Sequence, residues 1–403
     1  MSWKETCPMN ERVRFIGDLL GEERNMSELC TLYGVSRKTG YKWLARYEAA
    51  GVRGLEERSH APLHQPLAVA APVVQRLLHA RCQHPSWGPR KLLAWLQTRH
   101  PTLHWPAAST VGAILRRHGL VSPRKRTHKS PAHHTALINP DAPNALWCTD
   151  FKGQFRTGDG RYCYPLTLTD AWSRYLLVCR GVLLPDTASV WRWFERAFQE
   201  YGLPVAIRSD NGPPFASKAL GGLSRFSVWW IKLGIMPERI RPGCPQQNGR
   251  HERMHRTLKH ETTRPAAASL RAQQRVFDGF VTEYNEERPH EALGQRPPHA
   301  VYRGSTRAYP RRVPPIEYPD SYTVRHVRSN GEMKWQGHMV YVSQVLPGEP
   351  VGCCQIDEHT WRVYFGMLQL GVLDTRTLCI ATAPHTQHGD NAVSQNVSPI
   401  RAV

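Results

Sequence analysis

Three acidic residues have types and positions that could bind a metal ion. Asp210 ends the strand-like run VAIRSD and is followed at once by the turn residues Asn-Gly. Asp150 lies inside the apolar run ALWCTDF, where an uncompensated carboxylate is costly. Glu252 comes after a loop rich in Pro, Gly and Asn, in the first turns of a helix expected to begin near Gly249. Carboxylates from a strand interior, a strand end and a helix could converge at one edge of a sheet, where they would suit a hard divalent cation.

Other residues compete for these roles. Asp210 could instead be an ordinary turn residue that is exposed to solvent. Asp170 also ends a strand-like run and is an alternative ligand, and Cys148 is an alternative nucleophile, although strand alternation points its thiol inward. Glu261 lies nine residues after Glu252, about two and a half helical turns on, and so too far away to share a metal with it.

The net charge indicates the class of partner. The 403 residues include 53 Lys and Arg against 33 Asp and Glu, which gives a formal charge of +20. From residue 58 to residue 140 there are twelve Lys and Arg and no acid. A solvated surface normally carries charges of both signs. This segment therefore indicates that the protein's partner is an anionic polymer; the alternative is that the protein is simply basic.

The chain shows no signal for a membrane or for secretion. No apolar run reaches the 18 residues of a spanning helix, and the first residues lack the apolar region of a secretory signal. Ten scattered cysteines without CxxC spacing indicate reduced thiols rather than disulfides or a zinc site. We therefore expect a cytoplasmic protein. Its length predicts several domains.

Residues 1–57 are predicted to form a helix-turn-helix DNA-binding domain. Three helices are expected within residues 9–50, with Ser36 as the N-cap of the last. The expected core consists of apolar residues from the last two helices: Leu29, Leu32, Val35, Trp43, Leu44 and Tyr47. The residues left exposed to enter the major groove are Arg37, Lys38, Thr39, Tyr41 and Lys42. A purely structural helical hairpin is the alternative.

A second helix-turn-helix domain of winged-helix-like type is predicted for residues 67–122, after a linker at 58–66. Arg116 and Arg117 face outward from its last helix. The following linker, residues 123–143, is rich in proline and basic residues and is expected to follow a phosphate backbone. Its expected contacts are Arg124, Lys125, Arg126 and Lys129.

Residues 144–305 alternate strand-like runs with one amphipathic helix, which predicts an α/β domain. Asp186 or Thr187 is expected to cap the start of this helix, and Gly202 is expected to end it. After a linker at 306–319, short runs rich in Val, Tyr, Trp and Gly predict a small antiparallel β-barrel at 320–380. The polar tail, 381–403, is expected to be disordered.

Four motifs together carry a resemblance to a known family: WCTDF, SDNGPPF, PQQNGRHERMHRTLKHE and YNEERPHEALGQRPPHAVY. The chain resembles, over roughly residues 10–305, the DDE transposases of bacterial insertion sequences, whose ribonuclease H-like catalytic core is shared with retroviral integrases. The resemblance implies that Asp150, Asp210 and Glu252 are the catalytic, metal-binding triad. One departure is the 41-residue spacing between Asp210 and Glu252, which is longer than usual and leaves room for an extra turn or loop.

The resemblance also implies a mechanism. Two Mg²⁺ ions, for which Mn²⁺ can substitute, would assist hydrolysis at the element's ends and the attack of the freed 3′-OH on target DNA. The partners would be double-stranded DNA, both terminal inverted repeats and target, and at least one further copy of the chain. The expected location is the bacterial cytoplasm, in association with the nucleoid.

Arg256 and Lys259 stand at i+4 and i+7 from Glu252 and are expected to grip phosphates near the scissile bond. His255 is expected either to contact DNA or to lie at the surface. Two rival functions remain from the sequence: a catalytically decayed, sequence-specific DNA-binding protein or repressor, and a nuclease on the same fold.

Overall fold

The computed structural model describes residues 7–57, 68–121, 138–217, 219–240 and 245–382. The chain forms two compact units, Met1–Val69 and Ala70–Val403. No helix within the described residues is long and apolar enough to cross a membrane.

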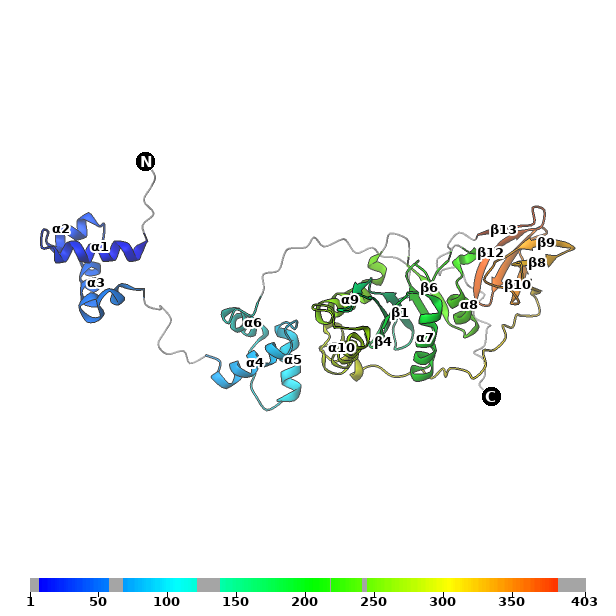
Figure 1. Ribbon diagram of the computed structural model, residues 1–403, viewed down its shortest axis with the longest axis horizontal. Coiled ribbons are helices and arrows are strands. Elements are labelled where there is room, and N and C mark those ends of the chain that lie inside the picture. Colours follow the sequence, from blue (N-terminus) through cyan, green and yellow to red (C-terminus); the bar gives the residue numbers. More distant parts are fainter. Residues whose placement is uncertain (1–6, 58–67, 122–137, 218, 241–244, 383–403) are drawn as a thin grey trace. The chain divides into compact units, whose positions relative to one another are not determined.

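Within residues 7–57, the first unit is a bundle of three helices followed by one 3-10 turn (Figure 1). The helices are α1 (Pro8–Leu20), α2 (Met26–Leu32) and α3 (Arg37–Ala50), and the turn is η1 (Gly51–Leu55). The predicted cap is confirmed, because the amide of Thr39 donates to the Ser36 hydroxyl at 3.2 Å.

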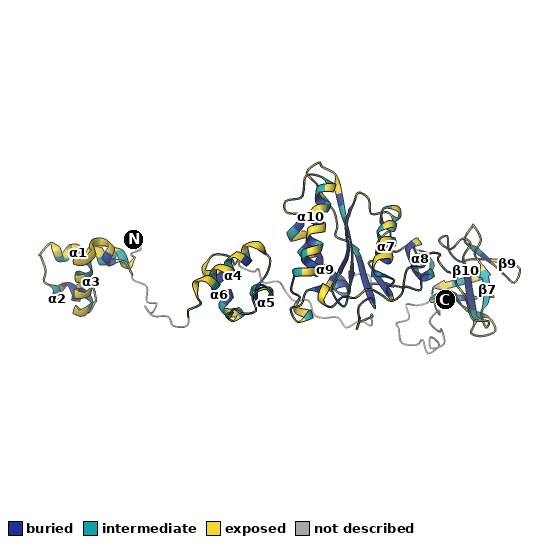
Figure 2. Ribbon diagram, turned by 90° about the horizontal axis from the view of Figure 1, so that it is seen from below, coloured by how far each residue is buried: buried dark blue, intermediate teal, exposed yellow. Residues whose placement is uncertain are grey.

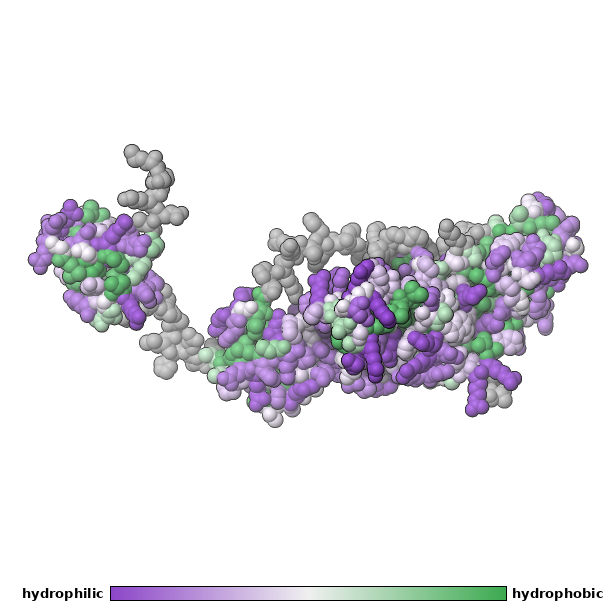
Figure 3. Space-filling model, viewed as in Figure 1, coloured by the Kyte–Doolittle hydropathy of each residue, from purple (hydrophilic) through white to green (hydrophobic). Residues whose placement is uncertain are grey.

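The prediction that Leu32 and Val35 lie in the core of this unit was wrong. Leu32 and Val35 are 61% and 37% exposed. Phe15 and Ile16 of α1 and Leu55 of η1 are buried in the core together with Leu29, Cys30 and Trp43 of the helix-turn-helix. Apolar residues also gather at the surface of this unit (Figure 3).

Gly40, in the middle of α3, lies where that helix packs tightly against side chains of α1 and α2. A Cβ atom at this position would lie 2.7 Å from the Cys30 sulfur, 2.9 Å from the Met26 sulfur and 3.1 Å from the Phe15 ring. The glycine weakens the helix by roughly 1 kcal/mol relative to alanine. It also permits the tight contact that sets α3 against the other two helices.

The second unit begins with a module of three helices. These are α4 (Ala71–Gln83), α5 (Pro89–Arg99) and α6 (Ala108–Arg117), whose buried residues include Leu77, Leu92, Leu96, Val111 and Ile114. Residues 68–121 contain helices without strands, so the wing expected of a winged helix is absent from this range.

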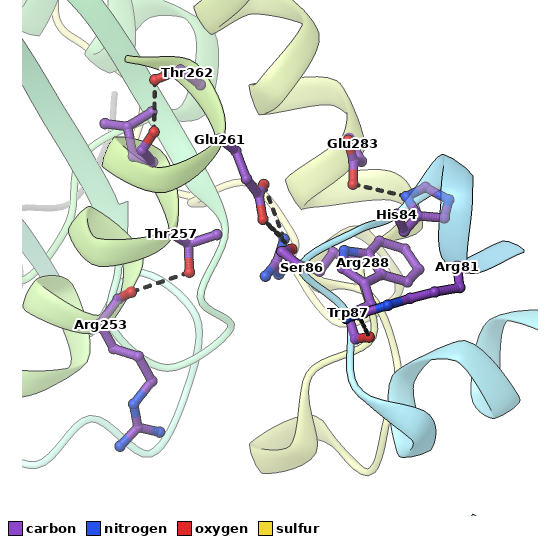
Figure 4. A network of polar contacts seen from close by, with 11 residues as sticks. Arg81, His84, Ser86, Trp87, Arg253, Thr257, Glu261, Thr262, Glu283 and Arg288 are labelled. Atoms are coloured by element: carbon purple, nitrogen blue, oxygen red, sulfur yellow. Dashed lines mark hydrogen bonds and ion pairs between the residues drawn. The ribbon is translucent and has the colours of Figure 1, made fainter. Parts of the chain in front are cut away.

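This module contacts the α/β core through polar side chains, a contact that we call the seam (Figure 4). His84 Nδ1 lies 3.0 Å from Glu283 Oε1, and the Ser86 hydroxyl donates to Glu261. Glu261 also accepts two hydrogen bonds from Arg288, at 2.9 and 3.2 Å. Arg90 pairs with Glu291 on the outer side of the same contact, at 2.8 Å. The seam therefore joins the α4–α5 region to the C-terminal part of the α/β core.

The α/β core is built on one mixed sheet. Its strands are β1 (Leu146–Phe151), β2 (Phe155–Arg156), β3 (Tyr162–Asp170), β4 (Leu176–Val182), β5 (Ala206–Ser209) and β6 (Met236–Arg239). The order is β4-β3-β1-β5-β6, and the short β2 pairs with the start of β3. Strands β1, β3 and β4 pair antiparallel, while β5 runs parallel to both β1 and β6.

Helices cover both faces of this sheet (Figure 2). One face packs against α7 (Thr187–Tyr201) and α8 (Arg225–Lys232), and the other packs against α9 (Gly249–Thr262) and α10 (Leu270–Thr282). Short helical turns complete the core: η2 (Leu220–Gly222), η3 (Pro245–Asn248), the π-helical η4 (Glu283–Glu287), η5 (Glu291–Leu293) and η6 (Pro298–Ala300). As predicted, Asp186 caps α7 and Gly202 ends it. The long spacing after Asp210 contains η2, α8 and β6.

The C-terminal barrel is not confirmed. The strands are β7 (Thr323–His326), β8 (Glu332–Trp335), β9 (His338–Tyr341), β10 (Pro350–Gln355), β11 (Thr360–Phe365), β12 (Leu368–Asp374) and β13 (Cys379–Thr382). Five of them form an open antiparallel sheet in the order β13-β12-β11-β10-β7, and β8 and β9 form a separate hairpin. Within the described residues the edge strands β13 and β7 do not pair, so the sheet does not close.

The tight contact at Gly40 can be tested by substitution. We expect Gly40→Ala to destabilise the first unit by about 1–3 kcal/mol, because the added methyl group overlaps two sulfur atoms. Gly17→Ala, in the open interior of α1, should stabilise it by up to ~1 kcal/mol. Hydrogen exchange of the α2 and α3 amides in the full chain measures both effects. Equal protection in the two variants would contradict the proposed role of Gly40.

Candidate active site

The pairing of β1 with β5 brings two of the three predicted acids to the same level. The parallel register runs from Leu146 opposite Ala206 to Cys148 opposite Arg208. Two residues further along come Asp150, inside β1, and Asp210, directly after the end of β5. Because side chains alternate along a strand, both carboxylates lie on the face that carries Cys148 and Arg208, which α9 covers.

These acids interact electrostatically. Burial, and next the neighbouring Asp210, raise the pKa of Asp150 to about 7, and Glu252 adds to the rise. Burial also raises the pKa of Asp210. The carboxylates therefore repel one another at neutral pH unless a proton or a cation lies between them.

Glu252 lies on α9, at the exposed side of the helix. The part of the chain that the structure describes contains no group of three acidic, His or Cys side chains close enough to form a ready-made metal site. The three acids thus lie in one region, but their carboxylate oxygens do not converge on one point where a metal ion could bind. Their chemistry still suits a hard divalent cation, since all the donors are carboxylate oxygens.

Two buried histidines fix α9 to the sheet. The Thr167 hydroxyl lies 2.8 Å from His251 Nε2 and 2.6 Å from His255 Nε2, and it donates to the Asp150 carbonyl at 3.0 Å. His251 Nδ1 lies 2.8 Å from the Thr169 hydroxyl. Since Thr167 has only one hydroxyl proton, both Nε2 atoms must donate to it. Burial lowers the pKa of His251 to about 3 and lowers that of His255 as well, so both rings are neutral.

The prediction that His255 contacts DNA or lies at the surface was therefore wrong. The ring is almost fully buried, with Nδ1 3.7 Å from Asp150 Oδ2. His251 was not singled out, although the i,i+4 spacing of two histidines around Glu252 offered a signal. Together they hold the helix that carries Glu252 against the strand that faces Asp150.

Arg208 is a second positioning residue that the sequence alone did not reveal. It is buried and pairs with Glu238 of β6, with Nε 2.6 Å from Oε2. Its guanidinium also donates to the carbonyls of Ile138 and Gln247, at 2.7 and 3.2 Å. These bonds anchor the chain that enters β1 and the turn that leads into α9.

The competing residues have other roles. Asp170 is fully buried and accepts hydrogen bonds from the amide of Asn144 and from the amide and hydroxyl of Ser173, so it braces the ends of β1 and β3. Burial raises the pKa of the Cys148 thiol to about 12, so it stays protonated and is a poor nucleophile at neutral pH.

The predicted DNA-contact residues lie in several regions. Those of α3 (Arg37, Lys38, Tyr41, Lys42), of α6 (Arg116, Arg117) and of α9 (Arg256, Lys259) are exposed, and Thr39 is half-buried. Arg124, Lys125, Arg126 and Lys129 lie outside the described residues.

Family comparisons agree with this architecture. Residues 140–245 and 233–298 match two models of an integrase core domain. Residues 11–62 match a helix-turn-helix domain, and residues 39–115 match a homeodomain-like domain. The models therefore cover both the helical N-terminal part and the sheet that carries the acids.

Similar proteins come from bacterial insertion elements. A 39.2 kDa protein of insertion element IS476 from Xanthomonas euvesicatoria is 28% identical over 63% of this chain and 71% of its own length. A 31.7 kDa protein of IS407 from Burkholderia multivorans is 28% identical over 69% of this chain and 91% of its own. Transposase InsD of IS2 from Escherichia coli is 27% identical over 57% and 78%.

Two solved structures are also similar. The HTLV-2 integrase catalytic core domain in complex with magnesium has a TM-score of 0.33 and 15% identity, covering 41% of this chain and 99% of that one. A chain of the simian T-cell lymphotropic virus intasome, solved in complex with PP2A regulatory subunit B56 gamma, has a TM-score of 0.36 and 16% identity, covering 77% of this chain and 99% of that one.

The raised pKa of Asp150 predicts that, in the absence of metal, the folded protein loses stability as the pH rises. Between pH 4 and pH 7 the folded protein retains a proton that the unfolded chain releases, so stability falls as the pH rises through this range. Asp150→Asn should remove this loss and, above pH 7, stabilise the core by on the order of 2 kcal/mol in EDTA.

Thermal unfolding from pH 4 to pH 8 measures the difference between the wild type and the variant. Asp159→Asn is the control, because this exposed carboxyl has its pKa lowered by the Thr157 hydroxyl and should gain nothing. A constant difference between wild type and Asp150→Asn across the pH range would contradict the assignment.

Proposed function

We propose that this chain, which is a DDE-type transposase related to those of bacterial insertion elements, binds the terminal inverted repeats of its element, cleaves the ends hydrolytically and joins the 3′-OH ends to target DNA. The observation that carries the proposal is the β1–β5 register. It sets Asp150 beside Asp210 on the face covered by the Glu252 helix, within the region that matches the integrase core.

Asp150, Asp210 and Glu252 would hold the divalent metal. The raised pKa of Asp150 supports this assignment, because a cation among these oxygens would offset both the cost of burying the charge and the repulsion from Asp210 and Glu252. Bound Mg²⁺ supplies charge neutralisation at the phosphoryl group and lowers the pKa of an attacking water. We propose a load of two Mg²⁺ ions, with Mn²⁺ as a substitute.

The chain's own residues prepare this site. Thr167, His251 and His255 hold α9 in place, and Arg208 fixes the turn before it, so Glu252 is presented to the two aspartates from a rigid base. The neutral histidines add no positive charge that would compete with a metal. Arg256 and Lys259, exposed on the same helix, would grip phosphates near the scissile bond.

DNA recognition is proposed for the two helical regions. In the first unit, α3 presents Arg37 and Lys42 in the manner of a recognition helix. In the second, Arg116 and Arg117 are exposed on α6. Joining two element ends to a target requires two active sites in one complex, so we propose that the chain acts on DNA at least as a dimer, in the bacterial cytoplasm and in association with the nucleoid.

The triad is tested by isosteric substitution. Asp150→Asn, Asp210→Asn and Glu252→Gln should each lower cleavage and strand joining by at least about 10³-fold, because each removes an anionic ligand and keeps the shape. DNA binding should be almost unchanged. In addition, Mg²⁺ should raise the thermal midpoint of the wild type more than that of any variant.

Gel assays of end cleavage and joining, on duplexes selected by the full chain from a random pool, provide the measurement. A variant with near-wild-type activity in Mg²⁺ would show that its residue is misassigned. A wild type that binds the selected duplex but never cuts it would point to a DNA-binding protein, and cutting without joining would point to a nuclease.

Sequence discrimination should reside in α3. Arg37→Ala and Lys42→Ala should each weaken binding to the selected duplex by roughly 5- to 150-fold, corresponding to about 1–3 kcal/mol for a base-reading contact. Arg14→Ala, which removes an exposed arginine of α1, is the control and should change binding little. Competition against a scrambled duplex measures specificity. Unchanged discrimination in both α3 variants would place recognition elsewhere.

A further inference from the structure

Two arginines converge on one carbonyl oxygen just after β3, beside the start of β1. Arg174, in the turn after β3, donates to the carbonyl of Ala171 at 2.8 Å, and Arg250, in the first turn of α9, donates to the same oxygen at 3.3 Å. Arg250 also contacts the Asn139 side chain at 3.2 Å. Two guanidinium groups are thus held close together through a neutral acceptor.

The backbone of Arg174 is itself unusual. Its φ is +68°, in the left-handed region that residues with a side chain rarely occupy. Such conformations cost on the order of 1 kcal/mol and are found more often at functional sites than elsewhere. Here the conformation places a large cation beside another cation rather than beside an acid.

Arg253 extends this pair along α9, three residues after Arg250 and therefore on a neighbouring part of the helix surface. Within the described part of the chain, the side chains of Arg174, Arg250 and Arg253 form no ion pair. In Figure 4 the Arg253 guanidinium points away from the other labelled side chains, whereas Arg288 is bound to Glu261. The positive charge on this flank of α9 is therefore left uncompensated.

A fourth cation reaches the group from the other side of the seam. Lys91 of α5 is half-buried, and its pKa is lowered to about 8, first by burial and then by Arg288, with Arg253 contributing. The nearby Glu261 and Glu291 oppose this effect but do not cancel it. The contacts of the neighbouring Arg90 and of Ser86 hold this part of α5 against the core.

We propose that Arg174, Arg250, Arg253 and Lys91 form a binding site for the phosphodiester backbone of DNA, at the seam between the α4–α6 module and the catalytic helix. A guanidinium group can donate two parallel hydrogen bonds to two oxygens of one phosphate. A bound phosphate would also neutralise the positive charge of these arginines, which form no ion pair within the described residues. The inference rests on the proposed function, because it assumes that DNA passes along α9.

This site is separate from the row formed by Arg256 and Lys259. At 100° per residue, Arg250 points about 160° away from Glu252 around α9, whereas Arg256 and Lys259 lie within about 40° of it. The helix therefore offers one cationic row beside the acids and another toward the seam. DNA held by the α4–α6 module would contact the seam row before it reaches the carboxylates.

The salt dependence of binding tests this site without requiring cleavage. The probe is a 30-base-pair duplex of arbitrary sequence, bound to the full chain between 50 and 200 mM KCl. Each lost phosphate contact should reduce the slope of log affinity against log salt by about 0.9. Arg250→Gln/Arg253→Gln should therefore flatten the slope by up to about 2, and adding Lys91→Gln should flatten it further. Over this salt range the double variant should lose roughly ten-fold less affinity than the wild type.

The matched control is Arg192→Gln/Arg196→Gln, which removes two exposed arginines from α7 on the opposite face of the sheet. Its slope should equal that of the wild type. The single variant Arg253→Gln guards against misfolding, because this side chain has no partner within the described residues, and it should flatten the slope by about 0.9.

Equal slopes for the wild type, Arg253→Gln and the double variant would overturn the proposal, and so would equal flattening by the α7 control. Neither result would touch the proposed function, which depends on the cleavage assay with the triad variants. Conversely, active triad variants would defeat the proposed catalytic role of the triad, while the salt slope would still decide whether this flank binds phosphate.

Discussion

The parallel pairing of β1 with β5 is the constraint on which the candidate site depends. It brings Asp150 and Asp210 onto the same level and the same face of the sheet, where burial raises the pKa of both carboxyl groups and the charge of Asp210 raises that of Asp150 further. A fold that buries such a pair carries an energetic cost that a divalent cation can remove. The same register leaves Trp147 and Ile207 on the opposite face, where they belong to the core under α7 and α8.

The surroundings of this pair are organised to hold one helix. Neutral histidines of α9 bind two threonine hydroxyls of β3, and Arg208 ties the turn before α9 to the sheet through a buried ion pair with Glu238. These interactions fix the position of α9 on its sheet-facing side only. The remaining surface of the helix carries Glu252 on one flank and, on the other, arginines that form no ion pair within the described residues. One helix could therefore serve both proposed roles, metal binding and contact with phosphate.

The rest of the second unit is attached to this core in two different ways. The α4–α6 module contacts it through charged and polar side chains at the seam. The C-terminal sheet shares an apolar cluster with Leu223, Val228 and Ile231 of the core, and Arg307 of the connecting segment donates to the carbonyls of Pro204, Leu233 and Gly234. Exposed ion pairs are screened as the salt concentration rises, so the seam should be weakened by salt more than the apolar contact.

The sequence alone determined features that depend on neighbours along the chain. The Ser36 and Asp186 caps, the end of α7 at Gly202 and the start of α9 at Gly249 follow from interactions over three or four residues, and all were predicted correctly. Motifs around the three acids indicated the family for the same reason, since each is a short local pattern. The sequence predicted that these acids lie in strands and a helix. It did not predict the free-energy cost of burying their carboxylates close together.

Only the tertiary structure decided which distant residues meet. His255 lies at the floor of the site because α9 docks on Thr167, some ninety positions earlier in the chain, and no local pattern records that contact. Leu32 and Val35 are exposed because α1 and η1 fill the core of the first unit in their place. The alternating apolar and polar residues of the C-terminal strands predicted a barrel. A sheet closes into a barrel only if its two edge strands pair, and in the described part of the chain β13 and β7 do not pair. Periodicity fixes the face on which a side chain lies, whereas strand register and helix docking fix what that face meets.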